Sequence, residues 1–255
     1  TIEAIAPADL KKAGPTYDLP IALGILMASG QVVADLDDAL VVGELSLDGV
    51  LRHTPGIISM ISLAASKGMR RAFVPFDDAP EAALGSDVEI YGLRTLADLV
   101  NHLNGDAPIT KFDPASVAEA GPSTPRADFF PIKGEGQVQR GPAIAAAGSH
   151  NVLMSGPPGS GKTLLARALP SILPPMTIEE SLEVTNIFSV RGLLPSDTPL
   201  LRERPFRSPH HGTSSAGLIG GGSWPRPGEV SLAHRGILFL DELPEQVLTH
   251  LNRRS

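Results

Sequence analysis

Apolar and polar positions alternate along the first hundred residues in a pattern that predicts strands and helices in turn. Apolar runs bounded by polar residues or glycine predict strands, and apolar residues at helical spacing predict helices. The predicted strands are residues 2–6, 71–75 and 88–92, and the predicted helices are residues 19–29, 56–68, 79–85 and 95–105. Asp18 is placed to cap the first helix. Asp48-Gly49 predicts a tight hairpin turn between two further strands within residues 41–53.

The pattern changes after Gly105. Residues 106–127 contain four prolines and no sustained period, which is typical of a linker. Beyond it we expect a helix at residues 137–147 that is weakened by Gly141-Pro142, then a strand at residues 150–155. A helix at residues 163–169 and a buried parallel strand at residues 237–240 follow. The pattern therefore predicts two α/β domains, residues 1–105 and 128–255.

The strongest chemical motif is GPPGSGKT, at residues 156–163. It satisfies the phosphate-loop pattern of glycine, four residues, then Gly-Lys-Thr. A preceding strand and a following helix would let backbone N–H groups surround the phosphates of ATP. Lys162 would reach the β- and γ-phosphates, and the Thr163 hydroxyl would bind Mg²⁺. The predicted nucleotide-binding residues are Gly156, Pro157, Pro158, Gly159, Ser160, Gly161, Lys162 and Thr163. A glycine-rich turn without a ligand is the alternative, which the flanking elements disfavour.

A second motif, ILFLDE, places two acids after the predicted strand at residues 237–240. Ligands of open α/β sheets bind at the carboxyl ends of the strands. Asp241 would therefore hold Mg²⁺ through a water molecule, and Glu242 would orient and deprotonate the attacking water. Lys162 and Glu242 are the predicted catalytic residues. An ordinary core strand that ends in a solvated acidic turn is the alternative.

Composition and charge limit the classes of protein to which this chain could belong. The net charge is -7: residues 1–127 carry a net charge of -8 and residues 128–255 a net charge of +1. The first half is therefore a poor nucleic-acid surface. There is no cysteine, which excludes disulfides and thiolate zinc sites and favours a cytoplasmic protein. The longest apolar stretch, residues 19–28, is interrupted by Pro20 and Gly24 and is shorter than the roughly 20 residues of a membrane span. We expect a soluble protein with no membrane partner.

The phosphate loop together with RPFRSPHHGTSSAGLIGGGSWPRPGEVSLAHRGILFLDELPE resembles the magnesium-chelatase-type AAA+ ATPases, in the ComM/YifB-like branch. APADLKKAGPTYDLPIALGILMASGQ and VGELSLDGVLRHTPGIISMISLAA resemble the Lon-protease-like domain that this branch places ahead of its ATPase. The implied fold is a Lon-protease-like (ribosomal S5 domain 2-like) α/β domain at residues 1–105. A linker at residues 106–127 would join it to a P-loop AAA+ core with a parallel sheet, incomplete at its C-terminus, at residues 128–255.

The resemblance also implies a hairpin insertion over residues 204–235 that points toward the pore of a ring. Residues 220–222 would form a mobile tip. The arginines that could face nucleic acid are Arg202, Arg204, Arg207 and Arg226. A solvated surface is the alternative. Trp224 either stacks on a base or anchors the hairpin. His210 and His211 would point to opposite faces if they lay in a strand, which disfavours a zinc site.

Active Lon-type enzymes use a serine and a lysine. The resemblance places these two positions on Thr16 and Ile58, so no lysine is present to activate a nucleophile. We therefore expect a front domain without proteolytic activity. The chain starts without methionine and stops soon after Glu242, so we expect a fragment of a longer protein that lacks a sensor residue, an arginine finger and a helical lid. Such a fragment would bind nucleotide with little turnover.

Three functions remain open for the parent protein. The first is an ATP-driven DNA helicase or branch-migration motor in DNA uptake and recombination, assembled as a hexameric ring. The second is the motor subunit of a magnesium chelatase, which drives Mg²⁺ into a porphyrin. The third is a regulatory binding protein switched by nucleotide. The Lon-like domain favours the first, because chelatase motor subunits ordinarily lack it.

Overall fold

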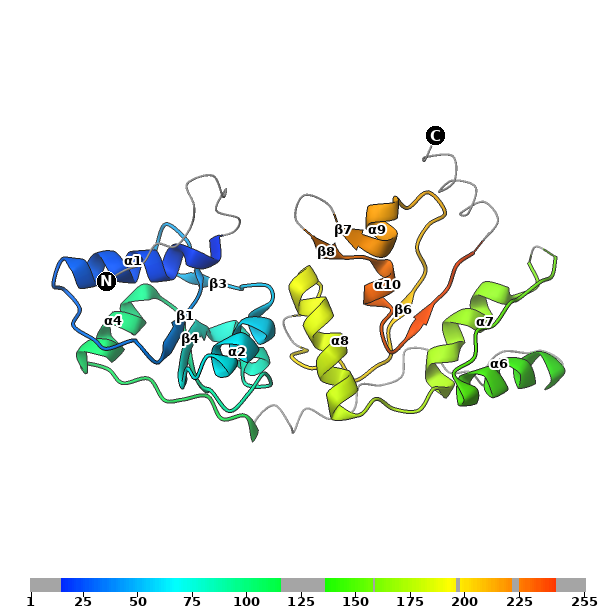
Figure 1. Cartoon of the computed structure of the whole chain (residues 1–255), viewed down its shortest axis with the longest axis horizontal. Helices are drawn as coiled ribbons and strands as arrows, with labels where there is room; N and C mark the ends of the chain where they lie inside the picture. Colours follow the sequence, from blue (N-terminus) through cyan, green and yellow to red (C-terminus); the bar gives the residue numbers. More distant parts are fainter. Residues whose placement is uncertain (1–14, 116–135, 158, 196–197, 222–224, 242–255) are drawn as a thin grey trace. The chain divides into compact units, whose positions relative to one another are not determined.

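The computed structural model describes residues 15–115, 136–157, 159–195, 198–221 and 225–241 (Figure 1). The chain divides into two compact units. The first unit comprises residues 1–120 with 192–199, and the second comprises residues 121–191 with 200–255. The predicted strand at residues 2–6 lies outside the described residues. Among the described residues, no helix combines the length and apolarity needed to cross a bilayer.

The first unit is built around a parallel sheet of three strands in the order β1-β4-β5. Its elements are η1 (Pro15–Tyr17), α1 (Asp18–Ala28), β1 (Ala39–Val41), β2 (Glu44–Leu45), β3 (Leu51–Arg52), α2 (Ile57–Ser66), β4 (Arg71–Pro75), η2 (Phe76–Asp78), α3 (Ala79–Ala82), β5 (Glu89–Leu93) and α4 (Leu96–Asn104). Strands β2 and β3 form the antiparallel hairpin predicted at Asp48-Gly49, where Gly49 has a φ of 81°. The predicted α/β alternation is confirmed in this unit.

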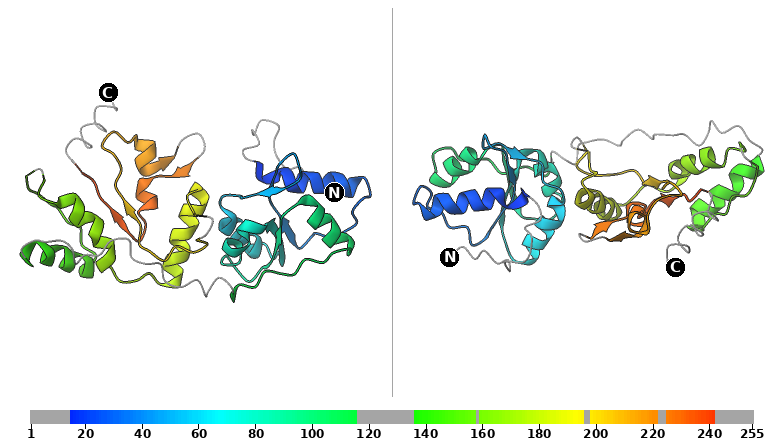
Figure 2. Two further views of the ribbon diagram at one scale, coloured as in Figure 1. Left: turned by 180° about the vertical axis from the view of Figure 1, so that it is seen from behind. Right: turned by 90° about the horizontal axis from the view of Figure 1, so that it is seen from above.

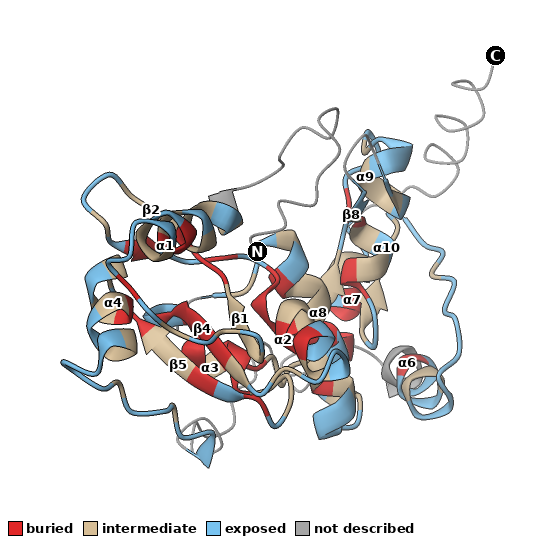
Figure 3. Cartoon of the chain, turned by 60° about the vertical axis from the view of Figure 1, so that its left-hand side comes forward, coloured by how far each residue is buried: buried red, intermediate tan, exposed pale blue. Residues whose placement is uncertain are grey.

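The central strand β4 separates two apolar clusters. Ala72 and Val74 pack with Ile57 and Ile61 of α2, whereas Phe73 packs with residues of α1 and α4. Successive side chains of a strand point to opposite faces. Because helices cover both faces of β4, its sequence is a continuous apolar run. Figure 2 shows the helices around the strands from two sides, and Figure 3 shows the burial of β4.

Local sequence signals fix both ends of α4 but not the start of α1. Helix α4 begins with a capping box, in which Thr95 and Asp98 each bond the other's backbone N–H, and it ends at Gly105 with a φ of 82°. The predicted cap at Asp18 is wrong. Tyr17 is the N-cap of α1, no side chain bonds the first turn, and Asp18 is the first helical residue. Its carboxylate in the first turn still interacts favourably with the helix dipole.

The stretch predicted as a linker begins with residues that contact the first unit. The Phe112 N–H donates to the carbonyl of Ile90 at 2.7 Å, and the Ile109 N–H donates to Nδ1 of His102 at 2.9 Å. Ile109 and Phe112 also pack against the two apolar clusters. These contacts continue the fold of the first unit beyond Gly105.

The second unit contains short strands and longer helices. Its elements are α6 (Gly136–Gly148), α7 (Lys162–Ala168), η3 (Leu169–Ile172), α8 (Ile178–Arg191), β6 (Phe206–Arg207), α9 (Ser215–Ile219), β7 (Gly220–Gly221), β8 (Arg226–Pro227), α10 (Glu229–Leu232) and β9 (Ile237–Leu238). Strands β6 and β9 pair in parallel, and β7 and β8 form an antiparallel hairpin. The hairpin lies within the insertion predicted at residues 204–235.

One expectation for this unit is confirmed and one is wrong. The helix predicted at residues 137–147 is present as α6, which contains Pro142. The alanines at 143 and 145–147 have the highest helix propensity and favour it. The predicted strand at residues 150–155 is absent from the described part of the chain, and Leu153 is 87 % exposed. A strand needs a ladder partner, which an apolar pattern alone cannot supply.

Candidate nucleotide-binding site

The phosphate-loop turn (residues 156–163) leads directly into α7. Gly159 and Gly161 have φ values of 78° and 81°, and Gly161 is the N-cap of α7. An added Cβ would meet no atom within 4 Å at either position, so the left-handed backbone, rather than a lack of space, requires glycine there. Pro158 lies outside the described residues. The turn has the backbone conformation in which successive N–H groups can face an anion.

Lys162 lies against the turn that precedes it. Its ammonium donates to the carbonyls of Gly156 at 2.9 Å and Pro157 at 3.0 Å, and to the Ser160 hydroxyl at 3.3 Å. The side chain is therefore folded back over Gly156, Pro157 and Ser160 rather than extended into solvent. A phosphate held by the turn would lie within reach of the same ammonium.

Thr163 and Asp241 come together although they are far apart in the sequence. The Thr163 hydroxyl lies 3.5 Å from Oδ2 of Asp241, which follows β9. A hydroxyl and a carboxylate this close are hard oxygen donors of the kind that Mg²⁺ binds, and Mg²⁺ usually keeps several waters as well. The two residues thus fit a hydrated Mg²⁺ ion. Glu242, the predicted base, lies outside the described residues.

The backbone that carries Asp241 is anchored at the start of β9. An added Cβ at Gly236 would lie 2.1 Å from the carbonyl oxygen of Pro205, so only glycine allows this approach. The Ile237 N–H donates to that same oxygen at 2.8 Å, and the Phe239 N–H donates to the carbonyl of Arg207 at 2.8 Å. The predicted strand at 237–240 is parallel as expected, but it is shorter and only partly buried.

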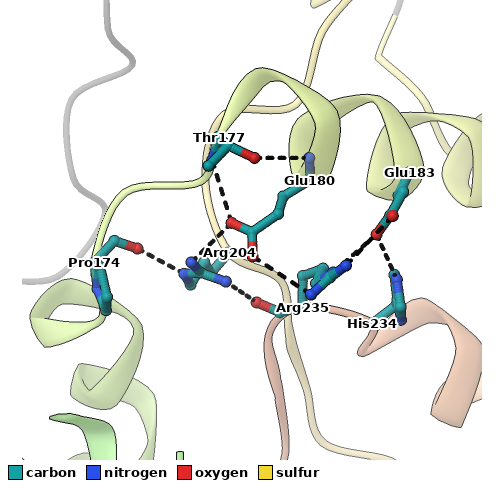
Figure 4. A network of polar contacts seen from close by, with 7 residues as sticks. All are labelled: Pro174, Thr177, Glu180, Glu183, Arg204, His234 and Arg235. Atoms are coloured by element: carbon teal, nitrogen blue, oxygen red, sulfur yellow. Dashed lines mark hydrogen bonds and ion pairs between the residues drawn. The ribbon is translucent and has the colours of Figure 1, made fainter.

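A network of charged side chains holds the turn before β9 against the start of α8 (Figure 4). Arg235, which has a φ of 58°, donates to Glu183 through Nε at 2.8 Å and Nη2 at 3.3 Å. Arg204 donates to the carbonyl of Arg235 at 2.6 Å and to Glu180 at 3.1 Å. Nε2 of His234 lies 3.0 Å from Glu183. The network therefore fixes the segment that leads to Asp241.

Glu183 is the acid most affected by this network. Hydrogen bonds from Arg235 and then from His234 lower the pKa of its carboxyl to about 2. Its side chain is 46 % exposed, so solvent screens the interaction. Glu183 stays ionised, and paired with Arg235, down to strongly acidic pH.

The four arginines predicted to face nucleic acid divide into two kinds. Arg204 belongs to the network above, and Arg207 forms a two-pronged ion pair with Glu229 at 2.6 and 2.8 Å. The pairing with Glu229 raises the pKa of Arg207. Arg226 is exposed on β8, and Arg202 is partly exposed. Arg204 and Arg207 therefore stabilise the unit, which the sequence pattern did not indicate.

His210 and His211 lie at a turn and not in a strand, so the opposite orientation expected for a strand does not apply. Their ring centroids are 3.9 Å apart. Trp224 and Gly222 lie outside the described residues. Gly220 and Gly221 form β7 of the hairpin.

In the first unit, the positions matched to the serine and lysine of Lon-type proteases hold Thr16 and Ile58. Ile58 is 4 % exposed, and its N–H donates to Glu81 at 3.2 Å. A different pair, His53 and the buried Asp78, was not predicted from the sequence. Nδ1 of His53 lies 2.5 Å from Asp78, whose other oxygen accepts from the Thr54 N–H at 2.8 Å. The hydrogen bond with Asp78 raises the pKa of His53. The two residues are 25 positions apart, so no local pattern signals the pair.

Comparisons with known families match both parts of the chain. The family described as "Magnesium chelatase, subunit ChlI" matches residues 128–253. The family described as "Subunit ChlI of Mg-chelatase" matches residues 1–78. The two matched regions contain both the phosphate-loop turn and the segment of Thr16 and Ile58.

Three similar proteins extend these matches. The competence protein ComM of Haemophilus influenzae is 45 % identical over 248 residues, which are 94 % of this chain and 48 % of ComM. The uncharacterized protein YifB of Salmonella typhimurium is 46 % identical over 244 residues, 94 % of this chain and 47 % of YifB. The uncharacterized protein Rv2897c of Mycobacterium tuberculosis is 43 % identical over 250 residues, 97 % of this chain and 49 % of that protein. The chain thus spans about half the length of the curated relatives it matches.

Proposed function

We propose, from the premise that this chain belongs to the magnesium-chelatase-type family in its ComM- and YifB-like branch, that its second unit binds Mg-ATP at the phosphate-loop turn. The observation that carries the proposal is the 3.5 Å approach of the Thr163 hydroxyl to Asp241. These residues come from motifs 78 positions apart in the sequence, and a nucleotide site of this class needs both beside one ion.

Each residue of the site has a distinct role in the proposal. The glycines at 156, 159 and 161 shape the turn, and its N–H groups at the start of α7 bind the β-phosphate. Lys162 leaves the loop carbonyls to bind the β- and γ-phosphates. Thr163 and Asp241 hold Mg²⁺, with Asp241 acting through water. Glu242 orients the attacking water and accepts its proton. Bound Mg²⁺ supplies neutralisation of the charge on the phosphates.

For the whole protein we propose an ATP-driven motor of the AAA+ class that assembles as a ring and acts on DNA. The similarity to a protein named for competence supports a role in DNA uptake and recombination. The exposed Arg226 on the β7–β8 hairpin is available for contact with DNA phosphates.

For the first unit we propose an interaction module of Lon-protease-like ancestry without proteolytic activity. A buried isoleucine occupies the position matched to the catalytic lysine, so no cation there can activate Thr16. Peptide cleavage by the chain that is abolished in Thr16→Ala would contradict this proposal.

The nucleotide proposal is tested by titrating the chain with a fluorescent ATP analogue and Mg²⁺. Lys162→Ala removes a charged donor to the phosphates, so we expect affinity to fall roughly tenfold to a hundredfold. Lys67→Ala, at an exposed lysine of the first unit, is the matched control and should bind as the parent chain does. Thr163→Ala should weaken binding in Mg²⁺ and leave binding in EDTA unchanged. Equal affinities for Lys162→Ala and Lys67→Ala would refute the proposal.

The motor proposal has to be tested on a longer protein. ATP hydrolysis by a full-length relative should be stimulated by branched DNA, and substitution of the lysine equivalent to Lys162 should abolish it. Stimulation by porphyrin in place of DNA would select the chelatase alternative instead.

A further inference from the structure

The second unit contains a cavity of about 680 Å³ that none of the described residues of the phosphate-loop turn lines. It lies between residues 170–175, which follow α7, and residues 201–207, which lead into β6. Its volume is in the range of pockets that hold one small molecule or one residue of a polymer.

Arg204 joins the two sides of this cavity. Its Nε donates to the carbonyl of Pro174 at 2.7 Å, and both residues line the cavity. The same guanidinium is held by Glu180 and by the carbonyl of Arg235, as Figure 4 shows. Because one well-held side chain spans both walls, the cavity is formed before any ligand enters.

Four arginines line the cavity, and two of them are neutralised. Arg204 pairs with Glu180, and Arg207 pairs with Glu229. Within the described part of the chain, Arg167 and Arg202 form no ion pair. Glu203 is the only acid among the lining residues. The cavity therefore presents two available guanidiniums, the side chain that binds phosphate with two parallel hydrogen bonds.

The remaining walls are apolar and flat. Phe188 and Phe206 line the cavity together with four prolines. The Phe206 ring stacks on Phe239 with centroids 6.2 Å apart, which fixes its orientation. Aromatic faces next to arginines are the combination that binds the base and the phosphate of single-stranded nucleic acid. An acidic peptide would use the arginines and leave the flat apolar walls without a partner.

We propose that this cavity binds one nucleotide of a single DNA strand, with its phosphate on Arg167 and Arg202 and its base against Phe188 or Phe206. The choice of DNA as the ligand rests on the proposed DNA-directed function. The residues that would bind it are separate from the phosphate-loop turn. A free mononucleotide has the same chemistry as one unit of the strand, so the test includes both.

The experiment measures binding of a fluorescent oligothymidylate to the 255-residue chain by anisotropy over a range of salt concentrations. Arg167→Gln and Arg202→Gln should each weaken binding about threefold to fivefold. Each should also reduce the salt slope by about 0.7, the value for one lost phosphate contact on a single strand. Glu203→Gln should strengthen binding, because it removes the repelling charge. Arg140→Gln, at an exposed arginine of α6 outside the cavity, is the control and should change nothing.

Several results would overturn the inference. The first is that oligothymidylate does not bind. The second is that Arg167→Gln and Arg202→Gln bind oligothymidylate with the same affinity and the same salt dependence as Arg140→Gln. Thymidine monophosphate with an affinity equal to that of the oligomer would overturn the assignment to a strand. Polyglutamate that displaces the oligomer at the same charge concentration would assign the cavity to an acidic peptide. Circular dichroism of each variant checks its folding, and the gain expected for Glu203→Gln cannot come from unfolding.

The same titrations in a Lys162→Ala background separate this inference from the nucleotide proposal. We expect Lys162→Ala to abolish binding of ATP and to leave binding of the oligomer unchanged. If Lys162→Ala still binds ATP while the arginine variants bind the oligomer more weakly, only the nucleotide proposal fails. If Lys162→Ala no longer binds ATP while the arginine variants bind the oligomer as before, only the cavity inference fails.

Discussion

Replacement of Gly236 by alanine tests the packing that positions Asp241. The added Cβ would lie 2.1 Å from the Pro205 carbonyl oxygen and 2.8 Å from the Pro205 nitrogen. Carbon and oxygen atoms in proteins approach to about 3.3 Å, so the backbones must separate by roughly 1 Å. The hydrogen bond from the Ile237 N–H, now 2.8 Å, would then exceed the hydrogen-bonding range.

The expected loss of stability follows from these contacts. Two ladder hydrogen bonds, from the N–H groups of Ile237 and Phe239, weaken or break at a net cost of about 1 kcal/mol each. Residual overpacking adds about 1–3 kcal/mol. Gly236→Ala should therefore lower the free energy of unfolding of the second unit by about 3–5 kcal/mol, a large fraction of a typical domain's about 5–15 kcal/mol.

Hydrogen–deuterium exchange measured on peptides reports this loss separately for the two units. The Ile237 and Phe239 amides should lose protection, and peptides from β4 and β5 should keep theirs. The affinity for Mg-ATP should fall as well, because β9 leads to Asp241. Gly141→Ala is the matched control: an added Cβ meets nothing within 4 Å there, and alanine should stabilise α6 by about 0.5–1 kcal/mol. If the two substitutions shift protection in the same direction, the close approach of Gly236 to Pro205 is refuted.

Two further predictions concern charge. His53 has a raised pKa in the folded state, so its pair with Asp78 stabilises the first unit fully below the unfolded value of 6.5, and this stability is lost as pH rises through the folded pKa. Urea unfolding followed by tyrosine fluorescence should show this fall, and His53→Asn should remove it; a slope that persists in the variant would contradict the assignment. Glu183 has a lowered pKa of about 2, so its contribution is present above the unfolded value of 4.5 and is lost as pH falls through about 2. Glu183→Gln should lower the Tm of the second unit at neutral pH and match the parent chain near pH 2; equal Tm values at neutral pH would contradict the role of the network.

The sequence predicted the first unit well because its signals are local. The Asp48-Gly49 turn and the apolar run of β4 each act within a few residues, and the structure contains both elements. The pair of His53 and Asp78 could not be predicted, because its two members come from separate turns that only the folded chain brings together.

The candidate site was predictable in part for a similar reason. The glycine spacing of the phosphate-loop turn and the acid after β9 are visible in the sequence, and the approach of Thr163 to Asp241 agrees with the expected pairing. The sequence could not indicate that Arg204 and Arg207 form ion pairs, because a sequence shows charge without its partners. Their partners, Glu180 and Glu229, are 24 and 22 residues away.

The pairing of β6 with β9 has a mechanical consequence. Phe206 and Arg207, which line the cavity, are in register with Ile237 and Leu238 of β9, and Asp241 follows β9 in the chain. A ligand that displaces β6 must therefore move or distort the strand that leads to the acid. Any free energy of coupling that results is reciprocal, so occupancy of either pocket would change the affinity of the other by the same factor.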